Sequence, residues 1–261
     1  MFRINALVTG VWRGLVQPGP AQRAYLNCLL VLAATVFLWW PKSNLSKALT
    51  QEQGPQPLLA VTIAIGLTIA YYSIRAGAEE FLLTGQQSLR EWTVGTPLSI
   101  RRIVSGAVLG HGLQTLHQLA LSAPLVCVAY TVGGGEWRSL VLCLVMVVLH
   151  AEVFWLVGAI IYLIIGHNGQ STFVTLRFFA AAAYLGISIA FPPASHFRMT
   201  IHLMDESSVW KISTTILTPQ LVFLLTYAAS IALLCLVLAT LLLRYRRNSA
   251  IADTPEMKTD Q

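Results

Sequence analysis

The stretch LVLCLVMVVLHAEVFWLVGAIIYLII, residues 140–165, decides the fold of this chain. It is apolar almost throughout, and it exceeds the roughly 20 residues that an α-helix needs to cross about 30 Å of hydrocarbon. Glu152 is its only acidic residue, and no Lys or Arg interrupts it. We therefore predict a membrane-spanning helix here, and we expect the rest of the chain to follow the same architecture.

Five more apolar stretches of suitable length surround this one. The chain is 56% hydrophobic and 11% charged, whereas soluble proteins carry about 25% charged residues. These features predict an all-α, polytopic integral membrane protein with six transmembrane helices in one domain over residues 1–247. A disordered cytoplasmic tail is expected over 248–261. The predicted spans are residues 24–40, 58–74, 103–132, 140–165, 173–191 and 221–243.

The positions of the basic residues predict the orientation. If the N-terminus lies in the cytoplasm, twelve of the 17 Lys and Arg residues fall in inner segments and five in outer ones, as the positive-inside rule requires. Both termini are then cytoplasmic, and we expect a multi-pass protein of a bacterial-type inner membrane. Membrane lipid explains the net charge of +6 better than nucleic acid does, because no basic cluster lies on a soluble face.

The longest outer connection precedes the sixth span. It runs from Pro192 to Gln220 and mixes apolar and polar residues. Because it is too polar to cross the membrane, we expect a short amphipathic or re-entrant helix on the outer surface.

The connection between the second and third spans is the richest polar stretch. From Leu82 onward, apolar or small residues recur at helical spacing up to Trp92, and polar residues including Arg90 and Glu91 take the opposite face. This pattern predicts a short cytoplasmic amphipathic helix that ends at Gly95, with Ser99 as the cap of the following helix.

This region resembles membrane subunits of type 2 ATP-binding cassette exporters. The residues concerned are EEFLLTGQQSLREWTVGTPLSIRRIVSGAVLG, 79–110. In that family an acidic helix leads into a Thr-Pro-Leu-Ser turn, here residues 96–99, then a basic pair, here Arg101 and Arg102, and then a glycine-bearing span. The layout of six spans, with an irregular outer segment before the sixth, is also similar.

The resemblance implies a coupling helix that docks on a separate cytoplasmic ATPase. The implied docking residues are Glu79, Glu80, Arg90, Glu91 and Trp92. The chain lacks G-x-x-x-x-G-K-[ST], so ATP and Mg²⁺ are expected in the partner ATPase and no cofactor in this chain. The family pairs two such bundles, which implies a dimer with itself or with a similar permease. The alternative is an interfacial helix with a solvated charged face.

Polar residues inside predicted spans form a second set of candidates. His111, Gln114 and Gln118 share one stripe of the third span, whereas His117 points elsewhere, and Glu152 lies in the fourth span with His150 on nearly the opposite face. Such residues either line a substrate pathway or fix helix packing by hydrogen bonds. Both interpretations remain open for the stripe and for Glu152.

Other functions have less support in the sequence. The segment His150-Ala151-Glu152 is not the H-E-x-x-H of zinc proteases. A membrane-embedded redox or metal protein, with ligands from His111, His117 and His150, and a non-transport membrane scaffold are the two alternatives. The sequence does not identify a substrate.

Overall fold

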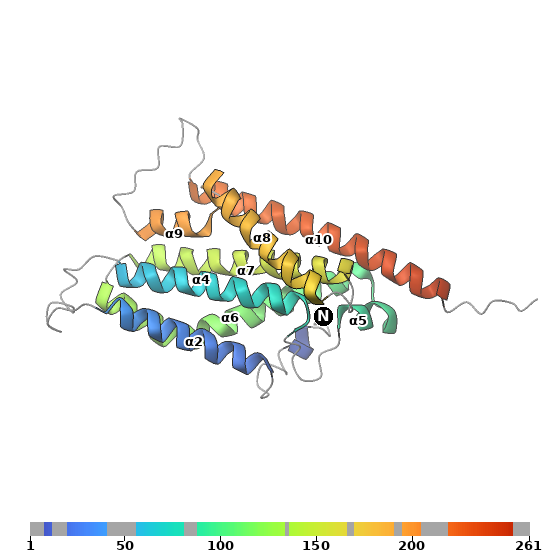
Figure 1. Ribbon diagram of the computed structural model, residues 1–261, viewed down its shortest axis with the longest axis horizontal. Coiled ribbons are helices and arrows are strands. Elements are labelled where there is room, and N and C mark those ends of the chain that lie inside the picture. Colours follow the sequence, from blue (N-terminus) through green and yellow to red (C-terminus); the bar gives the residue numbers. More distant parts are fainter. Residues whose placement is uncertain are drawn as a thin grey trace, which may run out of the picture.

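A computed structural model describes residues 8–11, 20–40, 56–80, 88–133, 136–165, 170–190, 195–204 and 219–252. All regular structure within these ranges is helical, as Figure 1 shows. The prediction of an all-α protein is therefore confirmed. In chain order the main helices are α2 (Pro20–Leu38), α4 (Gln56–Gly77), α5 (Leu89–Gly95), α6 (Ile100–Gly133), α7 (Trp137–Ile165), α8 (Gln170–Ala190), α9 (His196–Met204) and α10 (Pro219–Ala252).

Four of these helices are long and apolar enough to cross a membrane. They are α4, α6, α7 and α10, and each contains one of the predicted spans. The remaining two predicted spans, 24–40 and 173–191, coincide with α2 and α8, whose apolar parts are shorter. Many large apolar side chains face outward, such as Phe37 at 80% and Phe178 at 69% exposure. A surface of this kind fits lipid better than water.

Helices α4 and α7 form the centre of the bundle, and α2, α6, α9 and α10 pack around them. The two central helices approach so closely that backbone touches backbone. A Cβ atom on Gly77 would overlap the carbonyl oxygen of Trp155, and one on Gly158 would overlap that of Ile74. Lipid provides no hydrophobic force that drives helices together, so close packing must supply the attraction between them. Small residues such as these glycines allow the two backbones to approach closely enough.

The two largest clusters of the apolar core lie toward opposite ends of the bundle. One cluster joins α2, α4, α6 and α7 around the fully buried Leu58 and Ile65. The other joins α5, α6, α7 and α10 around Ile103 and Leu156. We call the end that carries the second cluster the α5 end; there α4 and α7 finish and α6 begins (Figure 1).

The predicted helix in the outer connection is present as α9. It packs on α4 and α7, in the half of the molecule away from the α5 end (Figure 1). The ring of His196, at its first residue, lies over Gly66 of α4, where a side chain on the glycine would collide with it. Residues 191–194 and 205–218 of this connection lie outside the described residues.

Helix α10 continues beyond its predicted span. It extends through Arg244 and Arg247 to Ala252, into the segment for which we predicted a disordered tail. Residues 253–261 lie outside the described residues. The third span includes Pro124 and is nonetheless one continuous helix, α6.

Candidate functional site

A buried polar pair links α6 to α7. Nδ1 of His111 lies 3.1 Å from Oε1 of Glu152, and both side chains are almost fully buried. At this distance the two groups form a hydrogen bond, and the group that carries the proton is its donor. The structure therefore brings together one member of the predicted polar stripe and the predicted intramembrane carboxyl group.

The surroundings of this pair hold it in place but leave it incompletely bonded. The indole of Trp155 stacks on the His111 ring, with centroids 5.4 Å apart, and Gly112 leaves room for Oε1 of Glu152. Among the described residues, Oε2 of Glu152 and Nε2 of Gln118 are buried without a hydrogen-bond partner. Buried polar atoms that lack a partner are costly, which is why they mark water, ion or ligand sites.

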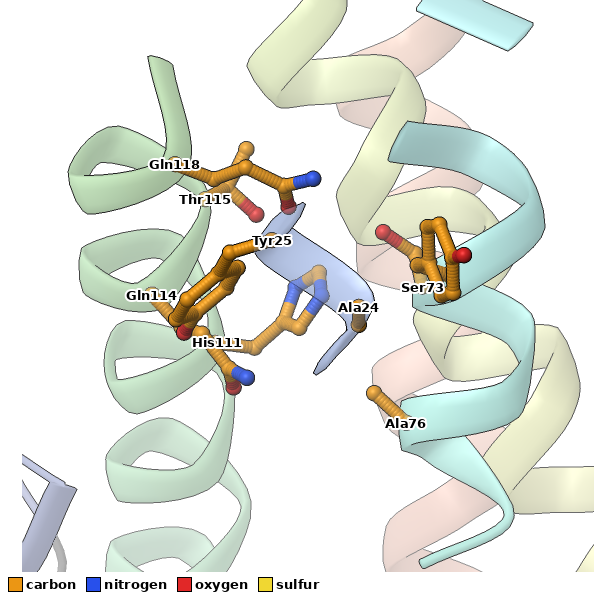
Figure 2. Close-up of a pocket in the computed structure, with 9 residues that line it drawn as sticks. Ala24, Tyr25, Ser73, Ala76, His111, Gln114, Thr115 and Gln118 are labelled. Atoms are coloured by element: carbon orange, nitrogen blue, oxygen red, sulfur yellow. The ribbon is translucent and has the colours of Figure 1, made fainter. Parts of the chain in front are cut away.

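The polar stripe of α6 opens into a small cavity between α2, α4 and α6. Figure 2 shows His111 and Gln118 projecting from α6 toward the other two helices. The cavity has a volume of about 20 Å³, which holds a water molecule but no larger ligand. Its walls also include the predicted Gln114 together with Tyr25, Tyr72, Ser73 and Thr115. A water here can bind the stripe, but a substrate cannot pass through it.

The other intramembrane histidines have separate partners. The ring of His117 packs edge-on against Tyr25 of α2. Nδ1 of His150 is 2.9 Å from the hydroxyl of Tyr227 on α10, and its ring stacks on that of His196. The sequence pattern did not indicate Tyr227 or His196, because both act across elements whose relative placement a single sequence does not reveal.

Glu79 and Glu80 make contacts within the chain. Oε1 of Glu79 accepts a hydrogen bond of 2.7 Å from the backbone N–H of Leu89 at the start of α5. Glu79 itself has a left-handed backbone, with φ of 62°, which turns the chain at the end of α4. Glu80 forms ion pairs with Arg75 of α4 and Arg177 of α8.

The amphipathic segment forms a well-capped helix. The described part begins at Leu89, and Ser88 and Glu91 form a reciprocal capping box, in which each side chain accepts a bond from the other residue's backbone N–H. The helix ends at Gly95, as predicted, and α6 begins directly after Ser99. Residues 81–87, the first part of the predicted helix, lie outside the described residues.

Arg90 faces the bundle rather than solvent, contrary to its predicted place on the polar face. Its guanidinium lies 3.3 Å from the carbonyl oxygen of Tyr162 and 3.5 Å from that of Leu163, near the end of α7. The rings of Tyr162 and Tyr245 flank it. The last carbonyl groups of a helix have no partner within the helix, and they attract a cation. The unpaired carbonyl groups at the end of α7 therefore explain why the Arg90 side chain points toward the bundle.

Arg246 of α10 is a second arginine at the α5 end, and the sequence pattern did not single it out. Its guanidinium donates to the carbonyl oxygens of Thr93, Thr96 and Leu98 at 2.7, 3.3 and 2.9 Å. Arg246 therefore fixes the end of α5 and the turn that follows. Arg246 lies in a run of basic residues that the positive-inside rule already explains. The sequence pattern therefore offered no sign of a structural role for it.

The outer face of α5 remains exposed. Glu91 and Val94 are exposed, the latter at 48%, and Pro97, Ser99, Arg101 and Arg102 continue this surface. Trp92 is half-buried against the core cluster at the α5 end, although its Nε1 has no partner among the described residues. Of the predicted docking residues, Glu80 and Glu91 are exposed. Glu80 is held in ion pairs with Arg75 and Arg177, and Glu91 lies on the exposed face of α5.

Comparison of the chain with known protein families, with characterised proteins and with solved structures finds no match.

Proposed function

We propose that this chain is the membrane permease subunit of an ATP-driven exporter, with ATP hydrolysis in a separate cytoplasmic subunit. The observation that carries the proposal is the way in which α5 is attached. Its inner face is bonded to the ends of three other elements, whereas its outer face, around Glu91 and Val94, is exposed. A helix attached in this way suits a docking element that passes movement to the membrane helices.

The attachment of α5 reaches most of the bundle. Arg90 joins it to the end of α7, Arg246 joins it to α10, and Glu79 joins its first turn to the end of α4. Bonds that involve a charged group are about twice as strong as neutral ones. A displacement of α5 by a docked ATPase would therefore move the ends of α4, α7 and α10 together.

The proposed topology has six spans with both termini in the cytoplasm. Helices α2 and α8 supply the two spans beyond the four long apolar helices. Their lengths of 19 and 21 residues correspond to about 29 and 32 Å at 1.5 Å per residue, close to the hydrocarbon thickness. In this orientation the α5 end, with Arg75, Arg90, Arg177 and Arg246, lies on the inner side of an inner membrane.

The proposed working unit is a dimer with itself or with a similar permease. The polar cavity of about 20 Å³ beside His111 admits water only. This cavity is therefore too small to serve as a path for cargo. Two bundles side by side would supply the two walls of such a path, which opens alternately to each side of the membrane.

The first test is purification of the native complex in mild detergent, with identification of the proteins that accompany the chain. We expect a Walker-motif ATPase in near-equal amount, and ATP hydrolysis that requires Mg²⁺. Val94→Asp places a charge on the exposed face of α5 and should abolish the association. Glu91→Gln keeps the capping box, because Gln also accepts the backbone bond, and should weaken it.

The matched control is Glu136→Gln, which removes an exposed carboxylate just before α7, at the end of the bundle away from α5. It should leave the association unchanged. Recovery of the chain alone, without ATP hydrolysis, would refute the exporter and favour the scaffold. An absorbance spectrum with haem or metal bands would favour the redox protein.

A further inference from the structure

A second cavity lies between α4, α7, α8 and α9, on nearly the opposite face of α7 from the His111–Glu152 pair. Its volume is about 200 Å³. A cavity of about 150 Å³ in another protein takes up benzene, so this one has room for a hydrocarbon group of at least that size.

Apolar side chains supply most of the walls of this cavity. They are Leu67, Ala70 and Ile74 of α4, Phe154 of α7 and Phe197 of α9. Such walls favour an apolar group over water, because water would find few hydrogen-bond partners between them. The part of any molecule that enters must therefore be uncharged and apolar.

Two polar residues of α8 that line the cavity bond to other parts of the chain. Nη1 of Arg177 lies 3.5 Å from Oε1 of Glu80, just beyond α4. The hydroxyl of Tyr184 accepts a 3.0 Å hydrogen bond from the backbone N–H of His196 at the start of α9. These contacts hold α8 at two points seven residues apart, which is about 10 Å at 1.5 Å per residue.

Helix α8 leaves the side of the cavity toward α4 open. It packs on α7, runs at an angle to α4 (Figure 1), and makes no contact of similar extent with α4 in the described structure. Leu67 and Tyr71 of α4 line the cavity and are exposed, at 52% and 48%. The opening therefore lies beside these two residues, on the surface of the bundle.

The position of the opening along α4 indicates what surrounds it. Leu67 lies halfway along this helix, which is long and apolar enough to cross a membrane. Halfway across a bilayer the medium is hydrocarbon, and headgroups lie about 15 Å away on either side. The ends of lipid acyl chains are thus the groups that meet the opening.

Packing, rather than escape from water, favours entry of such a chain. The bilayer is as apolar as the cavity, so transfer between them gains little from the hydrophobic effect. Walls that face a void, however, lose van der Waals contacts on one side. A flexible chain that fills the void restores these contacts. We propose that the cavity binds one acyl chain of a membrane lipid, which enters sideways past Leu67 and ends against Phe154.

The test places the full-length protein in phosphatidylcholine nanodiscs that contain a small fraction of phosphatidylcholine with a photoreactive diazirine at the end of one acyl chain. After irradiation and digestion, mass spectrometry locates the labelled residues. We expect labelling at Phe154 inside the cavity, and at Phe37 of α2, which is 80% exposed and reports contact with bulk lipid. A diazirine next to the ester group should label Phe154 at least fivefold less, because that group stays near the bilayer surface.

Two variants obstruct the cavity from different places. Ala70→Phe puts a ring inside it and should reduce labelling of Phe154 at least tenfold, with labelling of Phe37 unchanged. Leu67→Trp narrows the opening at an exposed position, where a larger side chain does not disturb the core, and should reduce labelling of Phe154 severalfold. Ala34→Phe adds the same ring as the first variant on the exposed surface of α2 and should change neither signal.

Labelling of Phe37 without Phe154 in the unaltered protein would overturn the proposal. Undiminished labelling of Phe154 in both Ala70→Phe and Leu67→Trp would also overturn it. Thermal unfolding of each variant in detergent verifies that a lost signal does not come from a misfolded bundle. The assay contains no ATPase, so its result and that of the exporter test are independent of each other.

Discussion

The two faces of α7 make contacts of opposite kinds. Toward α4, Gly158 and Gly77 bring backbone against backbone, and no side chain lies between them. Toward α6, the contact is a carboxylate and an imidazole, with a further buried carboxylate oxygen left without a partner among the described residues. The first contact is dry and has one arrangement. The polar groups in the contact between α7 and α6 can change their hydrogen-bond partners.

This difference indicates which helices move together. Close packing without side chains cannot slide without collision, since packed interfaces change between discrete arrangements rather than continuously. A polar pair with spare bonding capacity can accept a water or a proton as it opens. We infer that α4 and α7 act as one unit, and that the joint between α7 and α6 opens during the transport cycle that we propose.

The largest expected effect comes from a methyl group at the α4–α7 crossing. Gly158→Ala must push the two backbones apart, because its Cβ would overlap the carbonyl oxygen of Ile74, and we expect a loss of about 3 kcal/mol or more in stability. Gly186→Ala on α8 meets nothing within 4 Å and should be neutral or stabilising. Thermal unfolding in detergent measures both. Equal melting temperatures would show that the crossing is not close-packed.

The next effect is a pH dependence confined to α9. Burial lowers the pKa of His196 from its ordinary 6.5 to about 4, so the released helix binds a proton more readily than the packed one between these values. The stabilisation is complete above about pH 6.5 and is lost as the pH falls toward 4, by up to about 3 kcal/mol. Hydrogen exchange of α9, corrected for the intrinsic pH effect, should therefore accelerate across this range.

His196→Leu supplies the control, because it removes the titrating ring and keeps an apolar side chain over Gly66. Exchange in α9 should then lose this pH dependence, and exchange at the Gly77–Gly158 crossing should not change with pH in either protein. An identical pH profile in the variant would assign the effect to another group.

A smaller effect is expected at the end of α7. Arg90→Gln removes the charge that faces the carbonyl groups of Tyr162 and Leu163, and we expect a loss of about 1–2 kcal/mol. Arg101→Gln changes an exposed arginine on the next helix and should cost less than about 0.5 kcal/mol. Denaturation of the two variants side by side tests the difference. An equal loss of stability in both would show that Arg90 contributes no more than an exposed surface arginine.

The smallest effect on stability should accompany a large effect on transport. In Glu152→Gln the amide oxygen can still accept from His111, so stability should change by less than about 1 kcal/mol. The substitution removes the carboxylate, and we expect substrate-stimulated ATP hydrolysis by the proposed complex to fall at least tenfold. Glu152→Ala provides the contrast, because it leaves His111 without its partner and should also lower stability. Full activity of Glu152→Gln would leave this pair a packing role only.

Hydropathy was sufficient to predict the long helices but not how they contact one another. The predicted span 140–165 differs from α7 only at its first residues, since a continuous apolar run fixes both ends. His111 and Glu152 were each selected as polar residues in apolar runs. Their pairing depends on the rotation and crossing of α6 and α7, which one sequence does not specify.

The charged residues at the α5 end show a second limit of sequence reasoning. Arg90 was assigned to a solvent face from the spacing of its own helix, but the unpaired carbonyl groups of α7 determined its direction. α10 continues past residue 243 although its hydropathy falls there, and Arg246 finds carbonyl partners at the end of α5 and on the segment after it. In both cases the deciding partner lies on a distant segment.

The backbone contact at Gly158 joins α7 to α4 near one end of α7. Helix α7 runs from Trp137 to Ile165, so the arms on the two sides of Gly158 measure about 31 Å and about 10 Å at 1.5 Å per residue. If α7 and α4 rock together about this level of the bundle, the geometry of a lever converts a push at the short arm into a roughly threefold larger swing at the other. The short arm is the one that Arg90 joins to α5, so the ATPase that we propose to dock there would need only a small stroke.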